Sequence, residues 1–113
     1  MKLRHESDGD TVHVTLSGDL ASDSCTCLRN FWELRVAHHD VIDVDLDDVD
    51  TGDGRGVAEL TGLVQRARHA GKRITLRRAP QMVAHTLYKV GALEGDRPIV
   101  LVEPRENEEP TSS

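Results

Sequence analysis

The chain has 113 residues, enough for one domain with one hydrophobic core. Hydrophobic residues make up 37% and charged residues 30%, which is an ordinary balance for a globular protein. The formal net charge of −6 argues against general binding to nucleic-acid phosphates, which requires clustered Lys and Arg. The sequence contains no apolar run of membrane-spanning length, and its N-terminus lacks the apolar stretch of a signal peptide. We therefore expect a cytoplasmic protein without direct membrane insertion.

Strand-like segments recur along the whole chain. The alternation of apolar and polar residues is plainest in the segment that contains Val12, Val14 and Leu16. Gly18 is expected to end that strand. Five strands are predicted, over residues 3–6, 11–17, 41–46, 73–77 and 99–102.

Three helices are predicted between these strands, over residues 22–37, 55–70 and 80–91. In the first, the residues expected to face inward are Cys25, Leu28, Trp32 and Val36. In the second, the residues expected to face the core are Val57, Leu60, Leu63, Val64 and Ala67. Its opposite, exposed face carries Arg55, Glu59, Gly62, Arg66 and His69. Pro80 is expected as the first residue of the third helix, and Gly91 as its end.

The order of these elements predicts the fold class. Strands that alternate with helices indicate a largely parallel sheet, and the two strands at the start indicate an antiparallel hairpin. We therefore expect a single α/β domain over residues 1–103, with a mixed, mostly parallel sheet and about three main helices. Residues 104–113 are acidic, contain Pro and lack aliphatic side chains, so a disordered tail is expected there.

Catalytic and metal-binding patterns are weak in this sequence. Cys25 and Cys27 would point in different directions on a helix, and neither has the spacing of a zinc site. We expect Cys25 to belong to the core and Cys27 to be incidental. His38 and His39 are adjacent at the end of the first predicted helix, the other four histidines are scattered, and no Ser/Cys–His–Asp grouping can be placed. A binding module is therefore expected rather than an enzyme, with no cofactor and no metal.

The most informative segment is an Asp-rich loop, in which seven aspartates lie between Asp40 and Asp53. A calcium loop that starts at Asp48 would need an oxygen ligand at its fifth position and a glycine at its sixth, but these are Gly52 and Asp53. The spacing of the glycines in residues 52–56 does not fit a dinucleotide fingerprint either. The aspartates of the preceding strand, Asp43 and Asp45, are expected on its solvated face.

Asp53 occupies a different kind of position, in a strand-to-helix loop at the C-terminal edge of the predicted parallel sheet. Ligands and partners usually engage such an edge, and the next helix offers free N–H groups in its first turn. Gly54 and Gly56 would permit close approach of the backbone. Two interpretations stay open on spacing alone: a binding loop, or an ordinary Asp N-cap flanked by glycines.

Several segments occur in an order and spacing that is typical of one known family. They are Leu16-Ser17-Gly18-Asp19-Leu20, Val44-Asp45-Leu46, Asp53-Gly54-Arg55-Gly56-Val57-Ala58-Glu59-Leu60, Ala70-Gly71-Lys72-Arg73-Ile74-Thr75-Leu76 and Tyr88-Lys89-Val90-Gly91. Through these segments, residues 10–102 resemble a STAS domain, the fold of bacterial anti-sigma factor antagonists. The family pattern in the loop is Asp-Ser-x-Gly, eight residues after the position of Asp45, and a partner kinase phosphorylates the Ser.

The resemblance implies a phosphoacceptor where this chain has Gly54, which carries no hydroxyl. The usual switch, in which added phosphate charge ejects the partner, is therefore not expected at that position. Thr51 is the nearest hydroxyl before it, and a relocated acceptor there is a further hypothesis. The tripeptide Asp50-Thr51-Gly52 also resembles the Asp-Thr-Gly motif in the STAS subunit of bacterial phospholipid-transport ABC complexes. In that alignment the gap from Asp45 to the aspartate of the motif is five residues rather than eight.

The resemblance implies a regulatory, non-enzymatic bacterial signalling module that binds a protein partner. The expected surface is the loop 50–56 with the exposed face of the second helix, and its candidate residues are Asp53, Gly54, Arg55, Gly56, Glu59 and Arg66. The leading partner is an anti-sigma kinase-like ATPase, so that a role in transcription regulation follows. The alternative partner is the ATPase of a lipid-transport ABC complex, and a homodimer is a further option. A phosphoreceiver domain with its acceptor near Asp53 is a third alternative, although residues 1–10 lack the apolar first strand that it requires.

Overall fold

The computed structural model describes residues 1–51 and 54–103 of the chain. Its strands are β1 (Lys2–Asp8), β2 (Thr11–Leu20), β3 (Val41–Thr51), β4 (Arg73–Arg77) and β5 (Val100–Val102). Its helical segments are η1 (Ser22–Ser24), α1 (Cys25–Phe31), η2 (Trp32–Val36), α2 (Gly54–His69) and α3 (Gln81–Lys89). In this described part, no helix is both long enough and apolar enough to cross a membrane.

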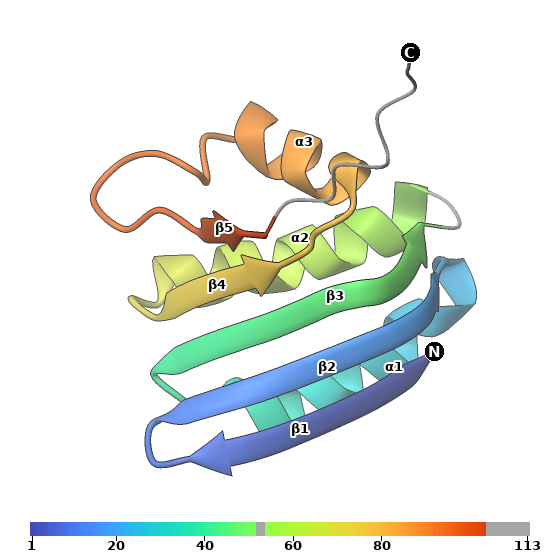
Figure 1. Cartoon of the computed structure of the whole chain (residues 1–113), viewed down its shortest axis with the longest axis horizontal. Coiled ribbons are helices and arrows are strands. Elements are labelled where there is room, and N and C mark those ends of the chain that lie inside the picture. The colour runs from blue at the N-terminus through green and yellow to red at the C-terminus, as the bar shows by residue number, and fades with distance from the viewer. Residues whose placement is uncertain (52–53, 104–113) are drawn as a thin grey trace.

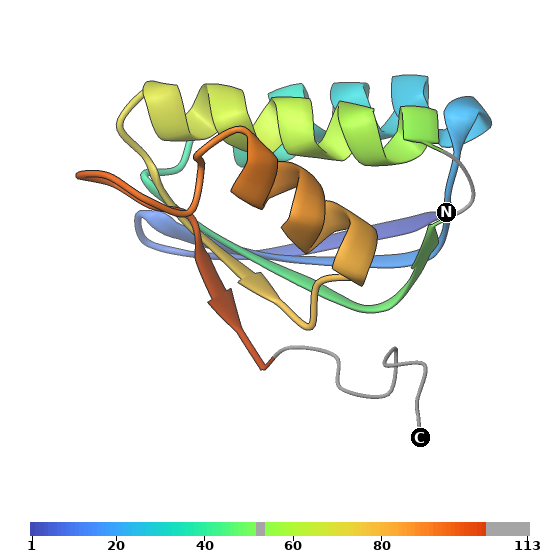
Figure 2. The same ribbon diagram turned by 90° about the horizontal axis from the view of Figure 1, so that it is seen from above.

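The five strands form one sheet in the order β1-β2-β3-β4-β5. β1 is antiparallel to β2, and each of the other neighbouring pairs is parallel. The helices lie together on one face of this sheet, and the other face stays uncovered by helices (Figures 1 and 2). This arrangement confirms the predicted fold class: a mixed, mostly parallel sheet opened by an antiparallel hairpin.

The hydrophobic core fills the space between the sheet and the helices. Every core residue predicted on the second helix is buried, as are the inward residues of the central strands. The buried residues at the centre of this layer are Val12, Val14, Leu16, Ile42, Val44, Leu46, Leu60, Val64, Ile74 and Leu76. Alternation with a period of two in the strands, and the apolar arc on α2, are therefore sufficient to explain how the two layers join.

β3 is longer than predicted, and a β-bulge explains the difference. The register between β2 and β3 runs from Thr15 opposite Asp45 to Ser17 opposite Asp48, so β3 contains one extra residue at this point. The extra residue interrupts the alternation of side chains after Leu46, which is where the sequence pattern appeared to end. Beyond the bulge the inward direction is restored, and Val49 is buried. The prediction that this strand ends at residue 46 is therefore wrong, because residues 47–51 continue β3.

The prediction that Gly18 ends its strand is wrong, because β2 continues past it to Leu20. Gly18 adopts a φ of +106°, pairs with Val49 and lets the strand continue to Leu20.

The first predicted helix is a composite of three segments. A turn of 3₁₀ helix (η1) leads into α1, and η2 continues as π-helix. Leu28, Trp32 and Val36 are buried as predicted, whereas Cys25 is only half-buried, so the expectation that it belongs to the core was partly wrong. Pro80 precedes α3 rather than opening it, because its ψ of 151° is extended.

Candidate partner-binding site

The predicted binding loop, residues 50–56, spans the end of β3 and the start of α2. β3 ends at Thr51, whose Cα is paired with Leu20 of β2, and α2 begins at Gly54. Asp53 lies outside the described residues, so its role stays a prediction. Gly54 matches the family's phosphoacceptor position and is the first residue of α2. The acceptor position therefore lies at the start of a helix. Thr51 instead lies in the strand and is half-exposed.

Gly56 holds the start of α2 against the end of β2. It is buried, and a Cβ added there would lie 2.4 Å from the carbonyl carbon and oxygen of Leu20 and 2.5 Å from the nitrogen of Ala21. All three atoms are backbone, so no side chain can move aside to make room. Gly56 was predicted as a contact residue for a partner, and its location gives it a positioning role beneath the surface.

Gly54 and Arg55 are exposed in the first turn of α2. A Cβ at Gly54 would meet no atom within 4 Å, and the residue has no left-handed φ, so that a side chain can be added there without strain. The backbone carbonyl of Arg55 accepts a weak S–H hydrogen bond from Cys25 at 3.7 Å. The same thiol lies 3.7 Å from the carbonyl oxygen of Ala21, so its single S–H is shared between two acceptors, and the contact with Arg55 links α1 to α2.

Glu59 is tied to α1 by a two-pronged ion pair. Arg29 donates from Nε to Glu59 Oε2 and from a terminal nitrogen to Oε1, each at 3.0 Å. The hydrogen bond from Arg29 lowers the pKa of Glu59 and outweighs the opposing effect of burial, and the charges of Arg29 and Arg66 lower the pKa further. Only 16% of the Glu59 side chain is exposed. Glu59 is therefore held in place as a charged residue beside α1, and Arg29 joins the candidate site although no sequence motif indicated it.

An open hollow lies between α1 and α2 at this end of the molecule. Its lining residues are Ser22, Cys25, Arg29, Arg55, Ala58 and Glu59. The hollow thus brings together two of the predicted residues, Arg55 and Glu59, with the arginine that binds Glu59. In the part of the chain that the structure describes, no group of three or more His, Cys, Asp or Glu side chains is arranged to hold a metal ion.

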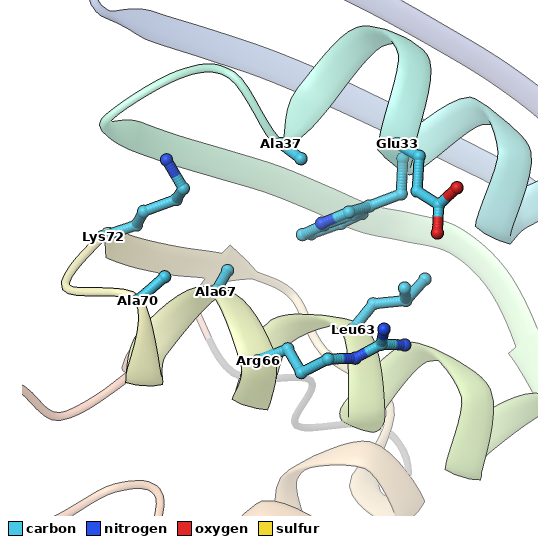
Figure 3. A pocket seen from close by; sticks show the side chains of 8 residues that line it. Glu33, Ala37, Leu63, Arg66, Ala67, Ala70 and Lys72 are labelled. Atoms are coloured by element: carbon cyan, nitrogen blue, oxygen red, sulfur yellow. The ribbon is translucent and has the colours of Figure 1, made fainter.

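Arg66 lies farther along α2, at a second and more apolar groove. This groove has a volume of about 290 Å³ and lies between η2 and the C-terminal half of α2. Its lining residues are Trp32, Glu33, Ala37, Leu63, Arg66, Ala67, Ala70 and Lys72. In Figure 3 the Arg66 side chain borders the groove beside Leu63, with Glu33 across from it. The predicted surface is therefore divided between the start of α2 and this groove.

The aspartates of β3 lie on the uncovered face of the sheet, as expected, but Asp43 is not simply solvated. The Asp43 side chain is 13% exposed, and Arg77 of β4 contacts both of its oxygens, with the closest contact at 3.1 Å. His13 of β2 lies 3.6 Å from the same carboxylate. Asp45 accepts a hydrogen bond from the backbone N–H of Asp47. These aspartates organise the sheet rather than the candidate site.

Comparison with known proteins identifies the family. A family model described as "Mlab, STAS domain" matches residues 3–103. The chain is a STAS domain. This result excludes the phosphoreceiver alternative, since such a domain is doubly wound, with helices on both faces of its sheet, whereas the helices of this STAS domain cover one face (Figure 2). No curated protein matches the sequence.

Solved structures show the same fold at low sequence identity. The STAS domain is similar to the Bacillus cell fate determinant SpoIIAA in its phosphorylated form, with 16% identity, a TM-score of 0.68 and coverage of 95% of both chains. For the anti-sigma factor antagonist SpoIIAA in its unphosphorylated form, the identity is 17% and the TM-score 0.64, with 95% and 93% of the two chains covered. A putative anti-sigma factor antagonist from Thermotoga maritima matches at 11% identity and a TM-score of 0.59, covering 94% of this chain and 88% of that one.

Proposed function

We propose that this STAS domain is a non-enzymatic interaction module that binds a protein partner through the start of α2 and the hollow beside it. The observation that carries the proposal is the close contact of Gly56 with Leu20 and Ala21, because it fixes the first turn of α2 in an exposed position. Arg55 and the Arg29–Glu59 pair provide charge of both signs on that surface. Such a rigid, mixed-charge surface favours recognition of a specific partner.

The leading candidate for the partner is an anti-sigma kinase-like ATPase. Two observations support it: the gap of eight residues between Asp45 and Asp53, and the similarity in fold to SpoIIAA, which is described as an anti-sigma factor antagonist. Gly54 stands at the acceptor position and has no hydroxyl, so that phosphorylation there cannot release the partner. The complex is therefore proposed to be insensitive to ATP. A relocated acceptor at Thr51 is the alternative, and it would make the complex respond to ATP.

The second candidate is an accessory role on the ATPase of a phospholipid-transport ABC complex. The observation that favours it is the tripeptide Asp50-Thr51-Gly52, which resembles the STAS subunit of those complexes. In this case also, the start of α2 would meet an ATPase. The two candidates differ in the partner that a cell lysate should yield: a histidine-kinase-like ATPase for the first, and an ABC ATPase with its permease for the second.

The surface is tested with Arg55→Glu, which reverses a charge in the first turn of α2. We expect recovery of the ATPase partner from native lysate to fall at least about tenfold, since like charges across an interface are costly. The matched control is Lys89→Glu, which makes the same charge change at an exposed residue of α3. Equal recovery with both variants would show that the start of α2 is not the contact surface.

The missing switch is tested with Gly54→Ser. The site has room for the side chain, so the variant should fold like the wild type. We expect the complex of the variant with a kinase partner to dissociate on addition of ATP, whereas the wild-type complex persists. Peptide mass spectrometry then locates any phosphate. Release of the wild type with phosphate on Thr51 would move the acceptor to that residue, and release without any phosphate would refute the phosphorylation argument.

A further inference from the structure

The strand β1 forms one border of the sheet and has a neighbour on one side only. It pairs with β2 along its whole length, from Lys2 opposite Ser17 to Asp8 opposite Thr11. Among the described residues, no strand pairs with its outer side, and Figure 1 shows that side facing away from the rest of the sheet. An unpaired border of this kind presents a row of backbone N–H and C=O groups to another chain.

The side chains of β1 divide cleanly between the two faces of the sheet. Leu3, His5 and Ser7 are opposite the buried residues Leu16, Val14 and Val12, so they lie on the face that the helices cover. The four remaining side chains lie on the uncovered face, because successive residues of a strand point to opposite faces. They are, in order, Lys2, Arg4, Glu6 and Asp8.

These four residues form a block of two positive charges followed by two negative charges. Their neighbours on β2 are Ser17, Thr15, His13 and Thr11, none of which is a carboxylate, a lysine or an arginine. Within the part of the protomer that the structure describes, the charged side chains of β1 therefore form no ion pair.

We infer that β1 is a pairing edge for a second copy of this chain. Two copies would join antiparallel about a twofold axis at His5, and their sheets would become continuous. Lys2 of each copy would then lie opposite Asp8 of the other, and Arg4 opposite Glu6. Every charged residue of the block gains an opposite charge in this register, and oppositely charged cross-strand pairs stabilise a sheet.

Other alignments of the two strands are less favourable. A shift must be by two residues to keep the charged side chains on one face. Such a shift places Arg4 opposite Arg4, or Glu6 opposite Glu6. A parallel pairing in register would place every charge opposite its like. The pattern thus selects one antiparallel register, and the assembly closes at two copies because each β1 is used once.

Protection of the edge against aggregation is a competing explanation for charges on β1. A strand with one sign of charge would give that protection by repelling its own copies. The block of β1 does the opposite, since it is attractive to itself in the antiparallel register. The proposed edge is also separate from the start of α2, because β2 lies between β1 and β3, the strand that leads to α2. The inference therefore goes beyond the proposed function.

The test compares charge variants of the full chain by sedimentation equilibrium from micromolar to millimolar concentration. We expect the wild type to form a dimer that weakens as salt is added, since exposed charges are screened. Lys2→Glu with Arg4→Glu makes all four charges negative and should raise the dissociation constant at least about tenfold. Adding Glu6→Lys and Asp8→Lys to this double variant gives two negative charges followed by two positive ones, with the net charge of the wild type. This fourfold variant, called the restored variant below, should form the dimer again.

The restored variant separates pairing from net charge and from misfolding. Mixed with the wild type, it would place like charges opposite each other, so we expect each protein to pair only with itself. Circular dichroism checks that every variant keeps its secondary structure. Should the double variant unfold, Arg4→Glu alone provides the same comparison with one charge pair. A monomeric wild type at all concentrations, a dimer unaffected by the double change, or free exchange between wild type and the restored variant would overturn the inference.

Discussion

Replacement of Gly56 by Ala should destabilise the domain strongly for a single added methyl group. The new Cβ would lie 2.4 Å from the carbonyl carbon and oxygen of Leu20, whereas carbon atoms in contact normally lie about 3.5–4.0 Å apart. The start of α2 or the end of β2 must therefore retreat by about 1 Å. Overpacking of this kind costs about 1–3 kcal/mol, and the better helix propensity of Ala returns up to ~1 kcal/mol. Since backbone must move, we expect a net loss of about 2 kcal/mol.

Gly62 in the same helix provides the matched control. A Cβ at Gly62 would meet no atom within 4 Å, so Gly62→Ala should stabilise the domain by about 0.5–1 kcal/mol through helix propensity alone. Urea denaturation followed by the fluorescence of Trp32, which is 3% exposed and the only Trp, measures both variants. Equal stability of the two variants, with unchanged m-values, would refute the argument from close contact.

The remaining predictions concern other parts of the domain. Glu59→Gln should destabilise the domain above about pH 4.3, the usual Glu pKa, because Arg29 lowers the pKa of Glu59 in the folded state. The contribution of this pair is lost as the pH falls through the lower folded pKa, so denaturation of the two proteins should converge in acid. Leu60→Ala should cost about 2–5 kcal/mol, since the side chain is fully buried, and a smaller loss would indicate collapse of the cavity. Iodoacetamide should modify the exposed Cys27 faster than the half-buried Cys25, as peptide mapping would show, and equal rates would contradict this difference in exposure.

The fold was largely predictable because its signals are local. The apolar arc of α2 and the alternation in β2 predicted buried residues correctly, since each pattern repeats within a few positions. The bulge after Leu46 was not predictable from β3 alone. Its cause is the register with β2, and a register is a relation between two strands that neither sequence carries separately.

The start of α2 was predictable in position, but the contacts that its residues make were not. The glycines at 54 and 56 were both read as means of close approach, yet only Gly56 contacts backbone closely, while Gly54 is open. Which glycine does so depends on where Leu20 ends β2, 36 residues earlier in the chain. Arg29 was missed for the same reason, because its pairing with Glu59 spans 30 residues and becomes apparent only when α1 and α2 lie side by side.

The length of β3 has a consequence for the dynamics of this end of the molecule. β4 pairs with β3 only over Val41 to Asp45, whereas β2 accompanies β3 as far as Thr51. The strand thus leaves the interior of a wide sheet and ends as one side of a two-stranded ribbon. Free energies of local opening are lowest where neighbours are few, so amide hydrogens near Thr51 should exchange with solvent sooner than those near Val44. The last residues of β3, up to Thr51, would then be able to move without disturbing the centre of the sheet.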